Sequence, residues 1–162
     1  MTEKEAIIAE IRKEGAGTRK MLERLTDTQL SFKPHEKSYS AAALATHVSN
    51  LPFWILMILD TDGLDLGSPL PRLEPFTNVT ALIAFFDERL SGAVSALEAA
   101  EDTLLEKNWH LSKGENTIMK APKKMVIRYF ALNHLVHHRG QLSVYLRLQD
   151  VPVPGMYGPS AD

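Results

Sequence analysis

The chain has 162 residues, of which 44% are hydrophobic and 23% charged, with a formal net charge of -2 and no cysteine. This length suits a single domain, residues 1–162, and the composition excludes disordered, collagen-like and low-complexity proteins. A small net charge gives no field that would attract phosphate backbones, so we expect no nucleic-acid partner. Without cysteine there are no disulfides, thiolate ligands or thiol nucleophiles, and any transition-metal site must use imidazole and oxygen.

No segment is typical of a signal peptide or a membrane span. Residues 1–15 form a charged amphipathic segment without the continuous apolar stretch of a signal peptide. The longest apolar run, Leu51 to Leu59, is well short of the ~20 residues needed to cross a bilayer. We therefore expect no membrane partner and a cytoplasmic location.

A first helix is predicted over residues 3–25, where apolar residues recur at helical spacing between charged ones. Gly15 and Gly17 lie inside it and each costs roughly 1 kcal/mol relative to Ala. We expect these glycines to permit the close approach of another backbone. Residues 31–39, with a proline and several polar residues, predict a loop.

A second helix is predicted from an N-cap at Ser40 to about Leu59. Pro52 should kink it, because proline lacks the backbone N–H and frees a carbonyl upstream. The stretch from Asp60 to Phe76 is rich in Gly, Pro and Asp. A connection of this length is typically functional or mobile, and we expect it to cross one end of the helices.

A third helix is predicted from Thr77 or Asn78 to about residue 100. Residues 108–119 contain turn residues between short mixed runs, which predicts an irregular excursion or a small hairpin. Pro122 suits the first position of a last helix, and the Pro- and Gly-rich tail from residue 151 cannot continue it. Four amphipathic helices without convincing strand pairs predict an all-α fold, an antiparallel four-helix bundle.

A basic cluster straddles the start of the last predicted helix and consists of Lys120, Lys123, Lys124 and Arg128. Such a cluster usually forms a solvated face, which is our expectation here. The alternative is a site for an anionic ligand.

Three histidines are predicted to converge between two helices. His134 and His138 are four residues apart, so both rings leave the same helix face one turn apart, a spacing that suits two bonds to one metal ion. Both lie on the stripe expected to face the interior, and His47 lies on the corresponding stripe of the second helix, between Leu44 and Leu51. This arrangement favours a divalent metal site at His47, His134 and His138.

A structural role competes with this interpretation. A single histidine on an apolar face is more often a hydrogen-bonded core residue than a ligand, and a buried pair needs partners because two charged rings would repel. His137 lies about 100° around the helix from its neighbours and suits a surface position or a supporting position beside the metal ligands. His35 and His110 fall in predicted loops and should be solvated.

Gly140, two residues after His138, weakens the helix by ~1 kcal/mol and suggests room for a neighbouring helix or a ligand. Trp54, Gln141 and Tyr145 could line such a pocket. Ordinary core packing is the competing role for these side chains.

Three segments give the chain a resemblance to the DinB/YfiT family of metal-dependent enzymes. They are residues 30–50 (LSFKPHEKSYSAAALATHVSN), residues 133–142 (NHLVHHRGQL) and residues 151–162 (VPVPGMYGPSAD). The resemblance implies a four-helix bundle, often a homodimer, with three histidines on zinc or nickel and an open coordination position. The family's ligands match His47, His134 and His138.

The resemblance also implies a chemistry. Better-characterised relatives include thiol-dependent transferases and isomerases that use bacillithiol or mycothiol, and many members have no assigned reaction. Our leading hypothesis is a metal-dependent S-transferase that acts on a small-molecule substrate with an external low-molecular-weight thiol, such as bacillithiol, mycothiol or glutathione.

Two further functions stay open. The first is a metal-dependent hydrolase, which usually needs a carboxylate near the metal to handle the protons of water. Residues 40–59 and 122–149 contain no Asp or Glu, so the base would have to be Glu14, Asp87, Glu88 or a loop residue such as Glu36. The second is a non-catalytic bundle that binds a metal or senses a ligand.

Overall fold

Three of the helices begin with a side-chain cap in the computed structural model, which describes residues 1–69 and 71–162. Thr2 and Glu5 satisfy each other's backbone N–H groups at the start of α1 (Glu3–Leu22). The Ser40 hydroxyl accepts a hydrogen bond from the Ala43 N–H at the start of α2 (Ala41–Asn50), as predicted. Asn78 caps α4 (Val79–Ala99) in the same way, through its side-chain oxygen.

The predicted second helix is two helices. After α2, the chain starts again at Pro52 as α3 (Phe53–Asp60), and the two axes are bent by 41°. The missing N–H and the ring of proline end the first helix, which is a larger effect than the predicted kink. Among the described residues no single helix is long and apolar enough to cross a membrane, and only α2 and α3 taken together pass such a test of length and composition.

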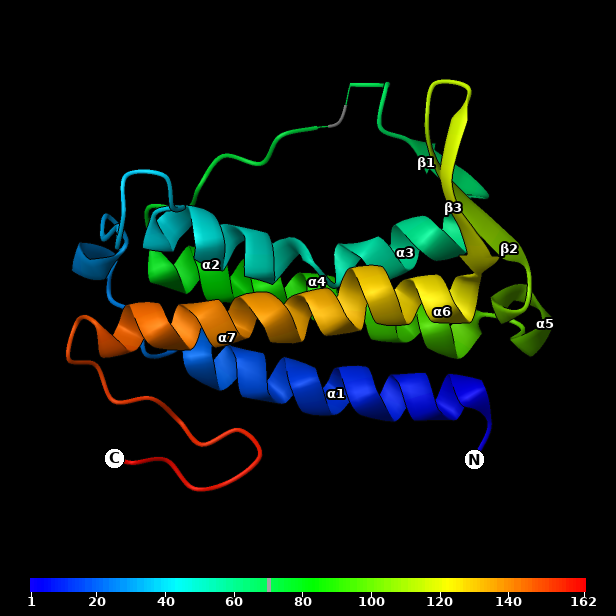
Figure 1. The fold of residues 1–162 in the computed structure, drawn as a ribbon. Helices are drawn as coiled ribbons and strands as arrows, with labels where there is room; N and C mark the ends of the chain where they lie inside the picture. Colours follow the sequence, from blue (N-terminus) through cyan, green and yellow to red (C-terminus); the bar gives the residue numbers. More distant parts are fainter. Residues whose placement is uncertain (70) are drawn as a thin grey trace.

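The last helical rod contains three consecutive parts, α6 (Lys123–Ile127), the π-helical segment η2 (Arg128–Asn133) and α7 (His134–Arg147) (Figure 1). Pro122 occupies the cap position just before α6 and not the first helical position. A π-helical segment adds a residue to the turn and is frequent at functional sites. Here it ends directly before His134.

A three-stranded sheet lies at one end of the helices, so the fold is predominantly helical and the all-α prediction was incomplete. Strands β2 (Asn108–Lys113) and β3 (Asn116–Pro122) form an antiparallel hairpin, which confirms the predicted small hairpin. Strand β1 (Gly63–Asp65) pairs in parallel with β2. A short helix, α5 (Asp102–Leu105), precedes the hairpin. Strands β1 and β2 are far apart in the chain, so their pairing produces no local pattern in the sequence from which it could be predicted.

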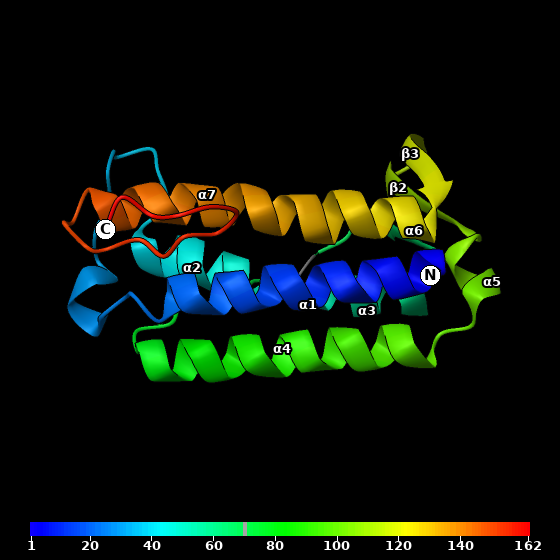
Figure 2. The same cartoon turned by 90° about the horizontal axis from the view of Figure 1, so that it is seen from below.

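The helices lie side by side along one direction, and the hydrophobic core lies between them (Figures 1 and 2). Helix α4 contacts α1, α2 and α3, while α7 contacts α1 and α2. Gly15 of α1 lets Leu90 of α4 pack closely, because a Cβ atom there would lie 2.6 Å from Cδ2 of Leu90 and the side chain would have to shift. The close approach expected at Gly15 is therefore present, although its neighbour is a side chain and not a backbone.

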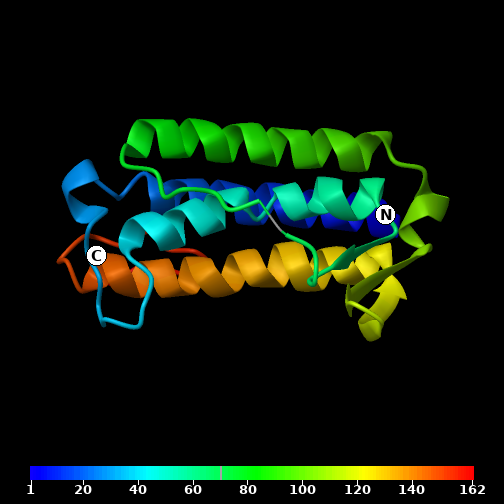
Figure 3. The same cartoon turned by 90° about the horizontal axis from the view of Figure 1, so that it is seen from above.

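The long connection was predicted to cross one end of the helices, but it runs along the molecule instead. After β1 it returns past α3 and α2 to the start of α4 (Figure 3). Near its end, the backbone N–H of Phe76 donates to the Thr46 hydroxyl at 2.9 Å, which ties it to α2. Residues of this segment between 71 and 75 line two cavities together with side chains of α2 and α3.

The basic cluster is only in part the predicted solvated face, because Lys120 is exposed and Lys124 and Arg128 are partly exposed, but Lys123 is not. Lys123 is buried, and its ammonium donates to the carbonyls of Leu59 and Thr61 at 2.8 and 2.7 Å, where it closes the end of α3. Burial lowers the Lys123 pKa. Two other residues of the cluster form ion pairs with distant segments. Lys124 pairs with Glu106, which follows α5, and Arg128 pairs with Glu10 of α1.

Candidate metal centre

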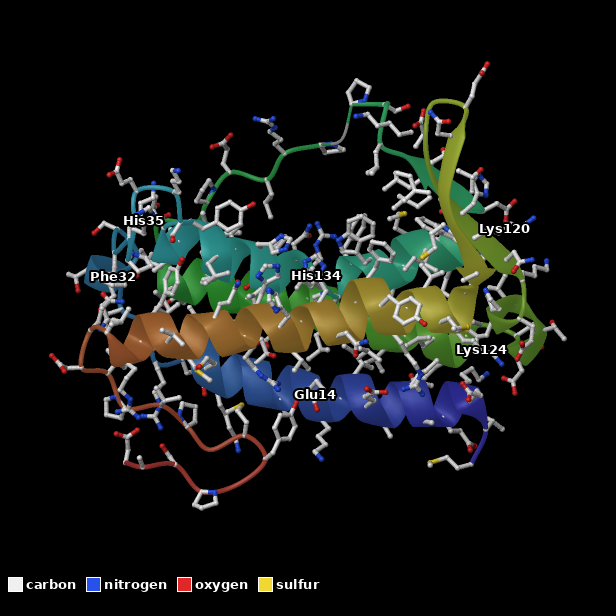
Figure 4. All side chains as sticks on the ribbon, viewed as in Figure 1. Glu14, Phe32, His35, Lys120, Lys124 and His134 are labelled. Carbon is white, nitrogen blue, oxygen red and sulfur yellow. The ribbon has the colours of Figure 1, made fainter. Side chains whose placement is uncertain are left out.

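The three predicted histidines converge where α2 faces α7. One ring nitrogen from each of His47, His134 and His138 can be chosen so that all three lie within 4.8 Å of one another. The His47 and His134 Nε2 atoms are 3.2 Å apart, and the His138 ring centroid is 4.6 Å from each of the other two. His134 lies midway along the molecule, between α7 and α2 (Figure 4). The structure thus brings together the full predicted set.

Desolvation keeps these imidazoles neutral. Partial burial lowers the pKa of His47 from 6.5 to about 4, and repulsion from His138 and His134 adds to this effect. Burial likewise lowers the pKa of His134 and of His138. At neutral pH the rings therefore present lone pairs, which is the state that a metal ion requires.

Gln141 fixes the orientation of one ring. Its side-chain oxygen accepts a hydrogen bond from Nδ1 of His138 at 2.6 Å. Because Nδ1 carries the proton in this arrangement, Nε2 of His138 is left as the acceptor nitrogen. Metal-bound histidines are typically oriented by such a second hydrogen bond. The donor set and its support therefore fit a divalent transition metal ion.

Two cavities adjoin the triad, one at His47 and one at His138. One, of about 480 Å³, is lined by His47 together with Asn50, Trp54 and Arg72. The other, of about 420 Å³, has the following neighbours of His138 in its wall: Lys37, Ser38, Tyr39, Gln141, Val144 and Tyr145. Tyr39 lines both cavities. The three side chains expected to line one pocket are divided between the two cavities, with Trp54 in the first and Gln141 and Tyr145 in the second.

Neither of these two cavities has a carboxylate among the described residues that line it. Two of the acidic residues that were considered as general bases, Glu14 and Asp87, form ion pairs away from the triad. Glu14 pairs with Arg139 at 2.6 Å between α1 and α7, on the other side of α7 from the triad (Figure 4). Asp87 pairs with Arg19 at 2.9 Å. The triad is therefore an all-nitrogen donor set with polar and apolar walls.

The other histidines lie outside this donor set. His137 is exposed, with its ring 4.8 Å from that of His138, which confirms the predicted surface position. His35 is exposed in its loop, and His110 is exposed on β2 and not in a loop. Gly140 faces open space, since a Cβ atom there would meet no described atom within 4 Å. The neighbouring helix suggested at Gly140 is therefore not found among the described residues, and room for a ligand stays a prediction.

A buried polar network, which was not predicted from the sequence, lies on the other side of α7 from the triad. Arg139, which follows His138 directly, is 3% exposed, and it donates to the Glu14 carboxylate and the Tyr157 hydroxyl at 2.6 and 2.7 Å. Glu14 and Thr18 continue the buried spacing of Ile7 and Ile11 along α1. Polar residues at core positions were the available indication of this network. It links the C-terminal tail to α1 and α7.

Comparisons with known proteins agree with this architecture. The DinB family model matches residues 1–162. The uncharacterised protein YrdA of Bacillus subtilis strain 168 is 25% identical over 151 residues, which cover 92% of this chain and 84% of YrdA.

Solved structures show the same fold. A DinB-like protein from Bacillus cereus ATCC 10987 has a TM-score of 0.73 at 23% identity, with 94% of this chain and 97% of that one covered. YfiT from Bacillus subtilis, described as a probable metal-dependent hydrolase with an unusual four-helix bundle topology, has a TM-score of 0.67 at 14% identity, with 91% and 87% covered. The whole-chain family match, together with the convergence of the three histidines, leads to one identification: the chain belongs to the DinB family.

Proposed function

We propose that this protein binds one divalent transition metal ion through His47, His134 and His138 and uses it in a thiol-dependent transfer reaction on a small molecule. The observation that carries the proposal is the placement of three neutral imidazoles between two cavities whose walls contain no carboxylate among the described residues. Three protein ligands leave a coordination position open, which is typical of catalytic and not of structural sites.

The reaction joins an external thiol to an electrophile. A bound divalent ion supplies a Lewis acid, which lowers the pKa of a coordinated thiol. The thiol then loses its proton, its sulfur forms a bond to the electrophilic carbon, and the leaving group departs with its bonding electrons and takes up a proton. The thiol must come from outside, since the chain has no cysteine; bacillithiol, mycothiol and glutathione are the candidates.

The two cavities suit two reactants. The cavity beside His138 includes Lys37 and Gln141, which can hydrogen-bond to a hydrophilic thiol. The cavity beside His47 includes Trp54 and Leu73, which offer apolar surface to the electrophile. A reaction with water as the second reactant would not need a second binding cavity.

Metal-dependent hydrolysis is the second candidate, because YfiT is described as a probable metal-dependent hydrolase. General-base help for an attacking water usually comes from a carboxylate within hydrogen-bond reach. Glu14 and Asp87 are engaged in ion pairs, which makes hydrolysis the weaker candidate.

Further properties belong to the same proposal. The helices constitute an antiparallel four-helix bundle, with α2 and α3 acting as one bent member; YfiT, which has a four-helix bundle topology, supports this assignment. Zinc and nickel are the proposed metals, since imidazole suits both. The family resemblance further leads us to propose a homodimer, and we propose that it acts in the cytoplasm, without nucleic-acid or membrane partners.

The first experiment measures metal content. Protein purified without an affinity tag and loaded with zinc or nickel should hold about one ion per chain by elemental analysis. His47→Ala and His134→Ala should lose it, while His137→Ala, which removes an exposed neighbour, should keep it. Wild-type protein without metal after loading would refute the site.

The second experiment measures turnover. Metal-loaded protein should consume an alkyl halide electrophile only when a thiol is present, and His134→Ala should abolish this activity. Hydrolysis of ester or amide substrates by the loaded protein without thiol would instead establish the second candidate. A fully loaded site with no turnover in either assay would favour a metal-binding or ligand-sensing bundle.

A further inference from the structure

Arg89 of α4 carries a cation that no described acidic residue neutralises. Its guanidinium carbon lies 4.7 Å from the ring centroid of Phe53 and 4.7 Å from that of Phe85, so two aromatic rings hold it in place. No ion pair within 4.0 Å and no side-chain hydrogen bond involves it among the described residues. Its Nε atom is buried without a hydrogen-bond partner.

Arg89 lines a cavity of about 400 Å³ with largely apolar walls, including Trp54, Met57 and Leu64. This cavity adjoins the one beside His47, because Asn50, Trp54, Pro71, Arg72 and Leu73 line both. Together the two adjoining cavities, called the cleft below, extend from the histidine triad to the guanidinium of Arg89, with Trp54 in the wall of both.

We propose that this end of the cleft binds the carboxylate of an organic acid whose apolar body lies over Trp54 and Met57 and whose reactive end faces the triad. The proposal deepens the proposed function, on which it rests, by assigning the electrophilic substrate to apolar carboxylic acids. Arg89 is its main anion-binding residue. Arg72, which lines both parts of the cleft, adds a second positive charge.

The geometry favours a carboxylate for two reasons. The planar guanidinium can donate from its two terminal nitrogens, which are not buried, to both oxygens of one carboxylate, a pairing that is about twice as strong as a neutral hydrogen bond. The two phenyl rings limit rotation of the guanidinium, so little conformational entropy is lost when the anion binds.

The nearby acids do not compete for Arg89. Asp87, two positions earlier on α4, is paired with Arg19 of α1. Glu88 and Glu74 are exposed, and neither lines this cavity. The positive potential of the cleft is therefore available to a ligand.

The test is a calorimetric titration of metal-free protein at pH 7.5 with hexanoate, with its neutral counterpart hexanamide and with hexyl phosphate. Absence of metal prevents the anion from coordinating an ion, so the result does not depend on metal binding or turnover. Wild-type protein should bind hexanoate at least about tenfold more tightly than hexanamide, as expected for loss of one charge-assisted pair. Hexyl phosphate should bind more weakly than hexanoate.

The variants locate the anion. Arg89→Gln should bring the ratio of the two affinities close to one, and Arg89→Lys should keep part of the preference because it keeps the charge and loses the fork. Arg24→Gln removes an exposed charge outside the cleft and should leave the ratio unchanged. Circular dichroism of each variant establishes that the helices are intact.

Several outcomes would overturn the proposal. They are equal affinity for hexanoate and hexanamide, binding of neither, tighter binding of hexyl phosphate, and a preference that persists in Arg89→Gln. Loss of the preference in His47→Ala would place the anion on the imidazoles and overturn it too. Failure of metal binding with the hexanoate preference intact would refute the proposed function and leave this site standing.

Discussion

Nε2 of His47 and Nε2 of His134 lie 3.2 Å apart, although 87 positions separate the two residues. Two neutral imidazoles at this distance can share one proton between these nitrogens. If each nitrogen carried a proton, two N–H donors would face each other and repel. The third ring, His138, is equally close to both. The cluster is therefore arranged to accept a cation from outside and to resist its own protonation.

Acid should destabilise the metal-free protein through these histidines. The unfolded chain takes up protons near pH 6.5, whereas folded His47 does so only near pH 4. Between these values the unfolded state binds more protons, so the free energy of unfolding falls as the pH is lowered through this window. Urea unfolding at pH 7.5, 6.0 and 5.0 should show this decrease.

A matched pair of variants assigns the acid effect. His47→Gln removes the residue with the lowered pKa and should flatten the decrease, whereas His137→Gln, which changes an exposed ring, should keep it. Equal slopes in both variants would contradict the assignment of the pH dependence to His47.

Gln141 should control metal affinity without being a ligand. Gln141→Leu removes the oxygen that accepts from Nδ1 of His138, so the ring can turn and change tautomer. Loss of such a supporting contact typically weakens metal binding by about 10- to 100-fold. Competition with a chromophoric zinc chelator measures the change. Gln141→Glu, which keeps an acceptor, should recover most of the affinity, and unaltered binding by Gln141→Leu would show that this contact does not orient His138.

The buried pair of Glu14 and Arg139 should dominate the ion-pair contribution to stability. Arg139→Met leaves a carboxylate that is almost fully buried without its cation, which typically costs about 3–5 kcal/mol. Arg12→Met breaks the pair with Glu98, in which both side chains are more than half exposed, and should cost about 1 kcal/mol or less. Chemical denaturation of both variants at pH 7 tests this contrast. Similar small losses in both would mean that Glu14 is solvated or protonated once Arg139 is gone.

Two glycines should respond in opposite directions to alanine. At Gly140 the new Cβ meets no described atom, so Gly140→Ala should raise the free energy of unfolding by about 0.5–1 kcal/mol through helix propensity and reduced freedom of the unfolded chain. At Gly15 the Cβ would lie 2.6 Å from a Leu90 methyl group, so Gly15→Ala should lower the free energy of unfolding. Thermal unfolding measures both. Destabilisation by Gly140→Ala would point to a contact outside the chain, such as a second copy of the protein.

Local chemistry determined a large part of this protein from the sequence alone. Helical spacing and cap residues such as Ser40 and Asn78 predicted the helices, because these patterns act within a few residues. The four-residue spacing of His134 and His138 likewise fixed their shared helix face. The position of His47 on an inward stripe was sufficient to predict the cluster.

Only the tertiary structure decided the rest. Strand β1 pairs with β2, and Lys123 is buried against the end of α3, through contacts between segments that are distant in the chain. The same is true of the cleft at Arg89, since its walls come from α2, α3, α4 and the long connection. A charged residue on a helix has the same local pattern whether it faces water or a cavity, and its environment is set by the elements packed around it.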